Sequence, residues 1–240
     1  QAVHKPHTPL KVLNGTKIAG TTPSRHLDMV KELDIQMEMM VQALKKQGVY
    51  CNTLIIFTSD NGGLLIKETL SSGHTSSNIY RGGKNKPYEG GTRVPFIAWW
   101  PSKIKGNRVC NMPVLGIDIM ATLADITMQK PEGNNAMDSS SLLPIFLGND
   151  SKKPHDFLIT QSGTGKEAMI TENGWKLIIE FKKDTTGTVR NPIALFNLND
   201  NPQENEKDNL VNNKLYAHKV KSLLATYNTT RNSKMKTGVY

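Results

Sequence analysis

The sequence has 240 residues, of which 30 are Lys or Arg and 21 are Asp or Glu, and its formal net charge is +9. Two cysteines are too few for a disulfide framework, and no apolar run approaches the length of a membrane span. The basic balance indicates an anionic partner. Because the sequence shows no helix-turn-helix, zinc-finger or RNP pattern, an anionic small molecule or polymer is expected in preference to nucleic acid.

The N-terminal segment, residues 1–20, is expected to form a loop around His7. This histidine lies between Pro6 and Pro9, which stiffen the backbone on either side. An imidazole can donate a hydrogen bond to an anion, although a solvent-exposed loop histidine is the simpler interpretation of these residues alone.

Residues 22–48 predict a long amphipathic helix. Thr22 supplies a hydroxyl for the N-cap, Pro23 suits the first turn, and Gly48 ends the helix. Apolar residues recur at spacings of three and four, at Leu27, Val30, Leu33, Met37, Met40, Val41 and Leu44. This periodicity is typical of a helix laid against a sheet.

The next element, residues 53–58, is an apolar, β-rich run that ends in Ser59-Asp60-Asn61-Gly62-Gly63. The run predicts a strand that is buried on both faces and central in a parallel sheet. Open α/β sheets bind ligands at the carboxyl ends of their strands, so Asp60 and Asn61 lie where a site is expected. Their charged and neutral oxygens suit a hard divalent cation. An ordinary Asx turn that closes the strand would use the same residues.

A second polar motif follows a loop rich in Ser and Gly, residues 64–82, which is long enough to be functional or mobile. The motif reads GKNKPYEGGTRVP over residues 83–95. Lys84 would bring a compact positive charge to the site, whereas Glu89 and Arg93 are expected to form a structural pair. A second buried strand is predicted immediately afterwards, over residues 95–100.

The character of the sequence changes near residue 154. Before this point a helix is predicted over residues 114–126. After it, short strands separated by turn residues predict an antiparallel meander, with strands at residues 157–160, 168–171, 175–181 and 193–196, a turn at 199–204 and a closing helix at 214–227. We therefore expect two domains: residues 1–153, and a small antiparallel β plus helix subdomain over residues 154–240.

Together the motifs resemble the second half of the sulfatase family, the formylglycine-dependent sulfate ester hydrolases of the alkaline-phosphatase-like superfamily. The resemblance rests on SDNG at residues 59–62, on GK-x-x-x-YEGG-x-R-x-P at residues 83–95, and on HKPHTP at residues 4–9, which fits the family's PH-x-P stretch. It implies an α/β fold: the carboxyl half of an alkaline-phosphatase-like sheet with flanking helices, followed by the small antiparallel β subdomain with one helix.

The resemblance also implies a chemistry, the hydrolysis of sulfate esters on a sulfated sugar or an aryl compound. In the family a formylglycine hydrate attacks sulfur, and a divalent cation, usually Ca²⁺, holds the sulfate. By this resemblance Asp60 and Asn61 would be metal ligands, and His7 and Lys84 would be catalytic residues that contact the substrate sulfate.

Residues 21–25, Thr-Thr-Pro-Ser-Arg, imitate the family's formylglycine signature, but threonine cannot be oxidised to the aldehyde, so the segment is expected to be a helix cap. The formylglycine is expected in a missing N-terminal half of the same enzyme, and this chain alone is expected to be inactive. The resemblance implies a periplasmic, secreted or lysosomal location, although the chain shows no targeting signal.

Two other classes of function stay open. A related metal-dependent phosphatase or phosphodiesterase of the same superfamily would also use Asp60, but it needs further His and Asp ligands, and His74 is the only histidine close in sequence. A non-catalytic anion-binding module is the second alternative.

Overall fold

The computed structural model describes residues 9–129, 131–132, 135–151, 153–185 and 187–233. His7 lies outside the described residues, so its predicted contact with an anion stays a prediction. Within the described part of the chain, no helix is both long and apolar enough to cross a bilayer.

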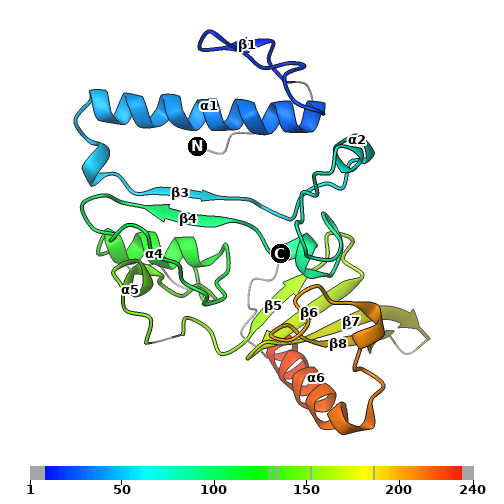
Figure 1. Ribbon diagram of the computed structural model, residues 1–240. Coiled ribbons are helices and arrows are strands. Elements are labelled where there is room, and N and C mark those ends of the chain that lie inside the picture. The colour runs from blue at the N-terminus through cyan, green and yellow to red at the C-terminus, as the bar shows by residue number, and fades with distance from the viewer. Residues whose placement is uncertain (1–8, 130, 133–134, 152, 186, 234–240) are drawn as a thin grey trace.

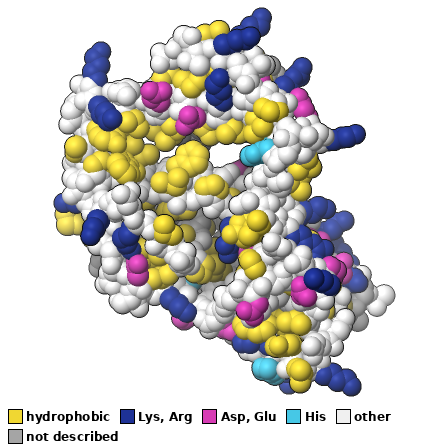
Figure 2. Space-filling view, viewed as in Figure 1, with side chains coloured by type: hydrophobic (Ala, Val, Ile, Leu, Met, Phe, Trp, Pro, Cys, Tyr) yellow, Lys and Arg dark blue, Asp and Glu magenta, His cyan; other side chains and the backbone are white. Residues whose placement is uncertain are grey.

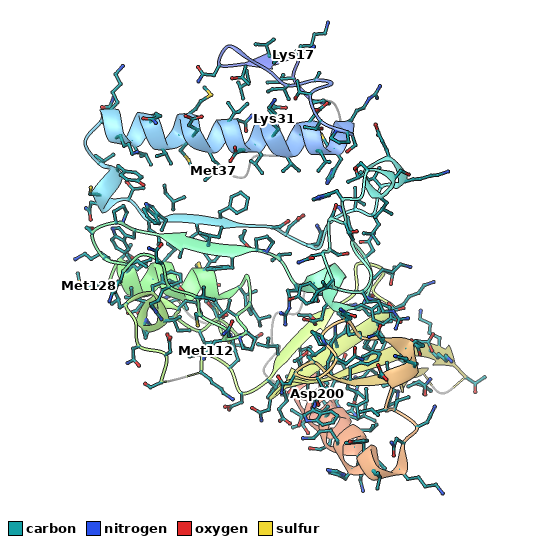
Figure 3. The ribbon with its side chains drawn as sticks, viewed as in Figure 1. Lys17, Lys31, Met37, Met112, Met128 and Asp200 are labelled. Carbon is teal, nitrogen blue, oxygen red and sulfur yellow. The ribbon has the colours of Figure 1, made fainter. Side chains whose placement is uncertain are left out.

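The first described residues form a small hairpin where a loop was predicted. Strand β1 (Val12–Leu13) pairs antiparallel with β2 (Thr16–Lys17). The turn between them is Asn14-Gly15, and both residues have positive φ, which Asn and Gly tolerate best. The hairpin is tied to the following helix because Lys31 Nζ donates to the carbonyl oxygen of Lys17 at 3.2 Å (Figure 3).

Helix α1 (Arg25–Lys46) begins two residues later than predicted. Ser24, not Thr22, is the N-cap, and its hydroxyl accepts a hydrogen bond from the backbone N–H of Leu27. The Thr22 hydroxyl instead donates to Asp28, whose carboxylate also accepts from the backbone N–H groups of Gly20 and Thr22. The segment 21–25 is therefore a helix cap, as the sequence predicts. At the other end Gly48 has a φ of +71°, as a helix-terminating glycine should.

Strands β3 (Ile55–Thr58) and β4 (Phe96–Trp99) form a two-stranded sheet, after a 3-10 turn η1 (Tyr50–Asn52). The sequence predicts that β3 pairs with parallel neighbours. This is wrong for the partner that is observed, since β3 pairs antiparallel with β4 and Ile55 lies opposite Trp99. β3 is only half-buried, and β4 alternates between half-buried and exposed residues. An apolar run indicates that a strand can be buried, but it does not determine the direction of its neighbour.

An apolar surface between α1 and the β3–β4 sheet has little cover. The two lie alongside each other in Figure 1, with helices α4 (Asp118–Ile126) and α5 (Leu143–Phe146) on the opposite side of the sheet. Figure 2 shows hydrophobic side chains around a hollow below α1. Large exposed apolar residues on the side of α1 that faces the sheet and on β4 are Val30, Met40, Ile97 and Trp99. We define these four residues as the open apolar face.

The covered side of the same sheet has a small core of its own. Leu142, Ile145 and Phe146 are buried, and Phe96 of β4 and Leu54 pack against them. Helices α2 (Lys67–Ser71) and α3 (Glu89–Thr92) lie in the segments between β3 and β4, so part of the predicted loop 64–82 is helical.

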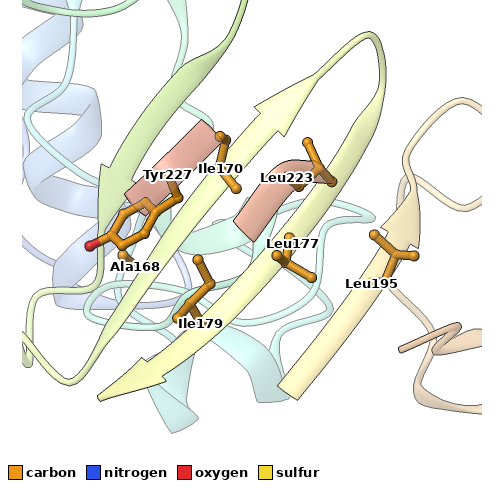
Figure 4. Packing of buried hydrophobic residues seen from close by; sticks show 7 residues of the cluster. All are labelled: Ala168, Ile170, Leu177, Ile179, Leu195, Leu223 and Tyr227. Atoms are coloured by element: carbon orange, nitrogen blue, oxygen red, sulfur yellow. The ribbon is translucent and has the colours of Figure 1, made fainter. Parts of the chain in front are cut away.

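The C-terminal part follows the predicted meander. Strands β5 (Leu158–Gln161), β6 (Glu167–Glu172), β7 (Trp175–Asp184) and β8 (Gly187–Asn197) form one antiparallel sheet in sequence order. Helix α6 (Ala217–Asn232) follows two 3-10 turns, η2 (Glu206–Asp208) and η3 (Lys214–Tyr216). Figure 4 shows Leu223 and Tyr227 of α6 packed on Ile170, Leu177 and Leu195 of the sheet. The domain boundary at residue 153 stays a prediction.

Candidate functional site

The two predicted metal ligands lie together where the chain leaves β3. The side chain of Asp60 is exposed, and Asn61 Nδ2 donates to Asp60 Oδ1 at 2.8 Å. The Ser59 hydroxyl donates to the carbonyl oxygen of Asn61 at 3.0 Å and closes the turn. This arrangement orients the amide of Asn61 through its nitrogen and leaves its oxygen, together with the second oxygen of Asp60, available to a ligand.

Glycines join this turn to the second motif by close backbone contact. The N–H of Gly62 donates to the carbonyl oxygen of Gly91, and the N–H of Lys84 donates to that of Gly63, both at 2.9 Å. A Cβ atom at Gly62 would lie 1.9 Å from the carbonyl oxygen of Gly90, which is far inside van der Waals contact. The glycines of both motifs are therefore needed so that the two loops can approach each other.

Lys84 has an exposed side chain on the loop that these hydrogen bonds hold against the Asp60 turn. The next residue, Asn85, has a φ of +71°, and a Cβ at Gly163 would clash with its side chain. The β5–β6 loop of the C-terminal sheet therefore lies directly against the Lys84 loop. The structure places Asp60, Asn61 and Lys84 on adjoining loops, and it does not describe His7.

The donor chemistry at the turn fits a hard cation in kind but not in number. A carboxylate and an amide oxygen are ligands that Ca²⁺ prefers, but Ca²⁺ takes about six to eight oxygen ligands. Among the described residues, no group of three or more His, Cys, Asp or Glu side chains converges to hold a metal ion. His26 lies close enough to His74 for the charge of His74 to lower the pKa of His26, which burial lowers first, but among the described residues these two histidines belong to no group large enough for a phosphatase metal site. Asp60 and Asn61 can form only one side of a cation site.

A buried charged cluster below the site was not predicted. Lys176 of β7 has a side chain that is 1% exposed, and its Nζ lies 2.9 Å from Glu89 Oε1 and 2.8 Å from Glu204 Oε1. Glu204 Oε2 accepts the backbone N–H of Glu89. Arg93 Nε donates to Glu89 Oε2 at 2.8 Å, which confirms the predicted Glu89–Arg93 pair.

The two carboxylates of this cluster differ in acidity. Burial raises the pKa of Glu204 above its ordinary value, and the charge of Glu89 adds to the effect, although Lys176 opposes it. Burial alone would raise the pKa of Glu89 as well, but Lys176 and Arg93 together hold that pKa below its ordinary value. A signal for the cluster was present in the sequence: Lys176 is the second residue of an apolar strand, and a lysine buried there needs an acidic partner.

Comparisons with known proteins agree on one family. The family described as Sulfatase matches residues 4–129. The chain is 34% identical over 219 residues to an N-acetylgalactosamine-6-O-sulfatase of Bacteroides thetaiotaomicron, covering 85% of this chain and 41% of that protein. It is 31% identical over 155 residues to the mouse steryl-sulfatase, covering 62% of this chain and 25% of that protein.

The fold comparison gives the same answer. A solved structure from work on glycosaminoglycan metabolism by Bacteroides thetaiotaomicron superposes with a TM-score of 0.78 at 30% identity, covering 95% of this chain and 48% of that one. The α/β fold is thus that of the alkaline-phosphatase-like sulfatases, of which this chain matches the C-terminal part. The chain spans less than half the length of these relatives. The chain belongs to the sulfatase family.

Proposed function

We propose that this chain is part of an enzyme that hydrolyses the sulfate esters of a sulfated sugar or an aryl compound. The observation that carries the proposal is the pair of hydrogen bonds from Gly62 to Gly91 and from Lys84 to Gly63. Through them a lysine and two hard-oxygen ligands lie on adjoining loops, which is the combination that an anionic ester needs. A sulfated amino sugar is the first substrate to test, because it is what the name of the bacterial relative specifies.

Each residue has a distinct role in the proposal. Asp60 and Asn61 would hold a divalent cation, Ca²⁺ in the first instance, whose charge would draw the sulfate oxygens to the site. The ammonium group of Lys84 would donate a hydrogen bond to the ester oxygen as that oxygen gains charge in the transition state. His7 would donate a hydrogen bond to the sulfate. A formylglycine from outside this sequence would supply the nucleophile.

The remaining part of the site would come from further chain. The open apolar face gives this its physical support, because large apolar patches on a protein surface are normally covered by a partner. The relatives are more than twice as long as the matched segment, which is enough chain to form that cover. We therefore propose that the 240 residues alone do not turn over substrate, and that the complete enzyme acts in a periplasmic, secreted or lysosomal compartment.

The test is sulfate release by the complete protein. It should be assayed with N-acetylgalactosamine 6-sulfate and with 4-nitrophenyl sulfate, and 4-nitrophenyl phosphate is the comparison for a phosphatase. Release of sulfate that is lost in Lys84→Ala and His7→Ala supports the proposal. Faster hydrolysis of the phosphate ester would support the phosphatase alternative instead. Binding of the sulfated sugar in calorimetry without turnover of any ester would support the anion-binding module.

A further inference from the structure

The site loops rest on the C-terminal sheet through charged side chains that cannot touch a substrate. We propose that Lys176 is a positioning residue for the site: it holds Glu89 and Glu204 together and so fixes the loops that carry Asp60 and Lys84. This inference rests on the proposed function for its effect on turnover, but its structural part can be tested without it.

Lys176 lies between two segments that are far apart in the sequence. Glu89 begins α3 in the second motif, and Glu204 lies in the turn after β8, 115 residues further along the chain. Both carboxylates contact the lysine Nζ within 3 Å, and the Glu204 side chain is fully buried. The lysine therefore links the second motif to two separate parts of the C-terminal segment.

Glu89 is connected to the site through the two residues that follow it. Glu89 is followed directly by Gly90 and Gly91. The carbonyl oxygen of Gly91 accepts the hydrogen bond that holds the Asp60 turn, and the N–H of Gly90 donates to the carbonyl oxygen of Arg81 at 2.9 Å. A shift of Glu89 would therefore move Gly91, whose carbonyl oxygen accepts the hydrogen bond from the N–H of Gly62. It would also move both ends of the loop that carries Lys84.

A second clamp fixes the same loop from its other end. The Arg81 guanidinium lies 3.8 Å from the centre of the Tyr88 ring. It donates to the carbonyl oxygen of Glu204 at 3.0 Å and to the Glu206 carboxylate at 2.7 Å. Tyr88 packs on the sheet face formed by Met169, Ile178, Ala194 and Phe196. The segment from Arg81 to Glu89 is therefore held by the C-terminal part at both ends.

The chemistry of the cluster argues for positioning and against a purely stabilising role. Replacing a buried ion pair with apolar residues of similar volume is often neutral or stabilising, so burial of Lys176 is not needed for stability alone. The two ion pairs do fix the position of Glu89 relative to Glu204, because both carboxylates must lie within reach of the same ammonium group. Since the side chain of Lys176 is 1% exposed, it has no access to a substrate.

The experiment compares variants that separate geometry from stability. Lys176→Met removes the charge and keeps the length of the side chain, and Lys176→Arg keeps the charge. Lys176→Met leaves the buried Glu204 without a cation and leaves Glu89 with Arg93 alone. A triple variant with Glu89→Gln and Glu204→Gln as well therefore removes the carboxylate charges together with the lysine charge. Lys182→Met, at an exposed lysine of the same strand, is the matched control.

Two measurements are made on each variant of the complete protein. Hydrogen exchange reports the protection of the Gly62 and Lys84 amides, with the amide of Ile178 in the sheet core as the internal reference. Sulfate release gives kcat and KM. We expect Lys176→Met and the triple variant to lose protection at Gly62 and Lys84 while Ile178 stays protected. Their kcat/KM should fall by about tenfold to a hundredfold, since a displacement of about 1 Å can cost about that much. Lys176→Arg should recover part of the loss.

Two outcomes would overturn the inference: unchanged protection at Gly62 and Lys84 in the triple variant, or loss of protection at Ile178 to the same extent as at the site. The second result would make the cluster merely structural. If the unmodified protein releases no sulfate, the proposed function fails, but the exchange results still decide whether Lys176 positions the loops.

Discussion

The backbone N–H of Lys84 donates to the carbonyl oxygen of Gly63 at 2.9 Å, and this one contact ties the lysine loop to the turn of Asp60. Neither residue is in a regular strand or helix. Because the bond joins main-chain atoms, it depends on the glycines that let the chains approach and not on any particular side chain. The two motifs, some twenty residues apart in sequence, therefore form one structural unit.

The close approach at Gly62 predicts a large effect of a single methyl group. Gly62→Ala should lower the free energy of unfolding by about 3 kcal/mol, because the new Cβ would lie 1.9 Å from a carbonyl oxygen that cannot move freely. Gly106→Ala is the control, since nothing lies within 4 Å of its Cβ position. Urea denaturation measures both. Equal stability of the two variants would contradict the observed contact.

Removal of the charge at Asp60 should weaken cation binding. In the complete protein we expect Asp60→Asn to lower the affinity for Ca²⁺ by about tenfold or more, because one anionic ligand is lost while the size of the side chain is kept. Asp34→Asn, at an exposed aspartate of α1, is the control and should bind Ca²⁺ normally. Isothermal calorimetry measures the affinity. An unchanged affinity in Asp60→Asn would remove this residue from the cation site.

The two exposed lysines of the second motif should behave differently. Lys84→Ala should lower kcat by about a hundredfold, as expected for the loss of one charge-assisted hydrogen bond to the transition state. Lys86→Ala should be nearly neutral, although it lies only two residues away and is equally exposed. Neither change should alter the melting temperature, because neither side chain is buried. A similar loss of turnover in both variants would indicate a general effect of positive charge.

The raised pKa of Glu204 predicts a specific dependence of stability on pH. Above its ordinary value of 4.5 the folded state keeps a proton on Glu204 that the unfolded state releases, so this group lowers stability as pH rises through that window. Glu204→Gln removes the effect, and its stability relative to the unmodified chain should increase from pH 4.5 upwards. Thermal melting over a series of pH values measures the difference.

Glu89 provides the opposite control for this pH experiment. Its pKa is lowered, so its contribution to stability is present above pH 4.5 and is lost as pH falls below that value. In Glu89→Gln, the part of the free energy of unfolding that falls as pH drops below 4.5 should therefore be lost.

For Glu204 the contradicting outcome is a Glu204→Gln variant whose stability, relative to the unmodified chain, decreases as pH rises. Such a result would show that the folded state does not favour the protonated carboxyl of Glu204.

The sequence predicted well those features that local patterns determine. The four strands after residue 154 follow from alternating apolar residues and turns, and the end of α1 follows from Gly48. The N-cap was misplaced because Thr22 and Ser24 are both good capping residues, and what distinguishes them is that the Thr22 hydroxyl donates to Asp28, six residues further on, while Ser24 accepts the helix N–H.

The features that depend on distant partners could not be predicted from local patterns. An apolar run such as residues 53–58 does not reveal the direction of its partner strand, so the antiparallel pairing with β4 was missed. Asp60 and Lys84 were selected by motif, and their loops do adjoin. The partners of Lys176 could not be foreseen, because Glu89 and Glu204 come from segments that nothing in the local sequence connects.

The cluster of Lys176, Glu89 and Glu204 also sets an order of events during synthesis. Glu89 leaves the ribosome 115 residues before Glu204, which at typical rates of elongation is a delay of roughly ten seconds. Throughout that interval the second motif lacks the acid that receives its backbone N–H, and for the first 87 residues of it the motif also lacks the lysine that pairs with its carboxylate. The loops of the site are thus made early and reach their final geometry late, after the four strands of the C-terminal sheet have emerged.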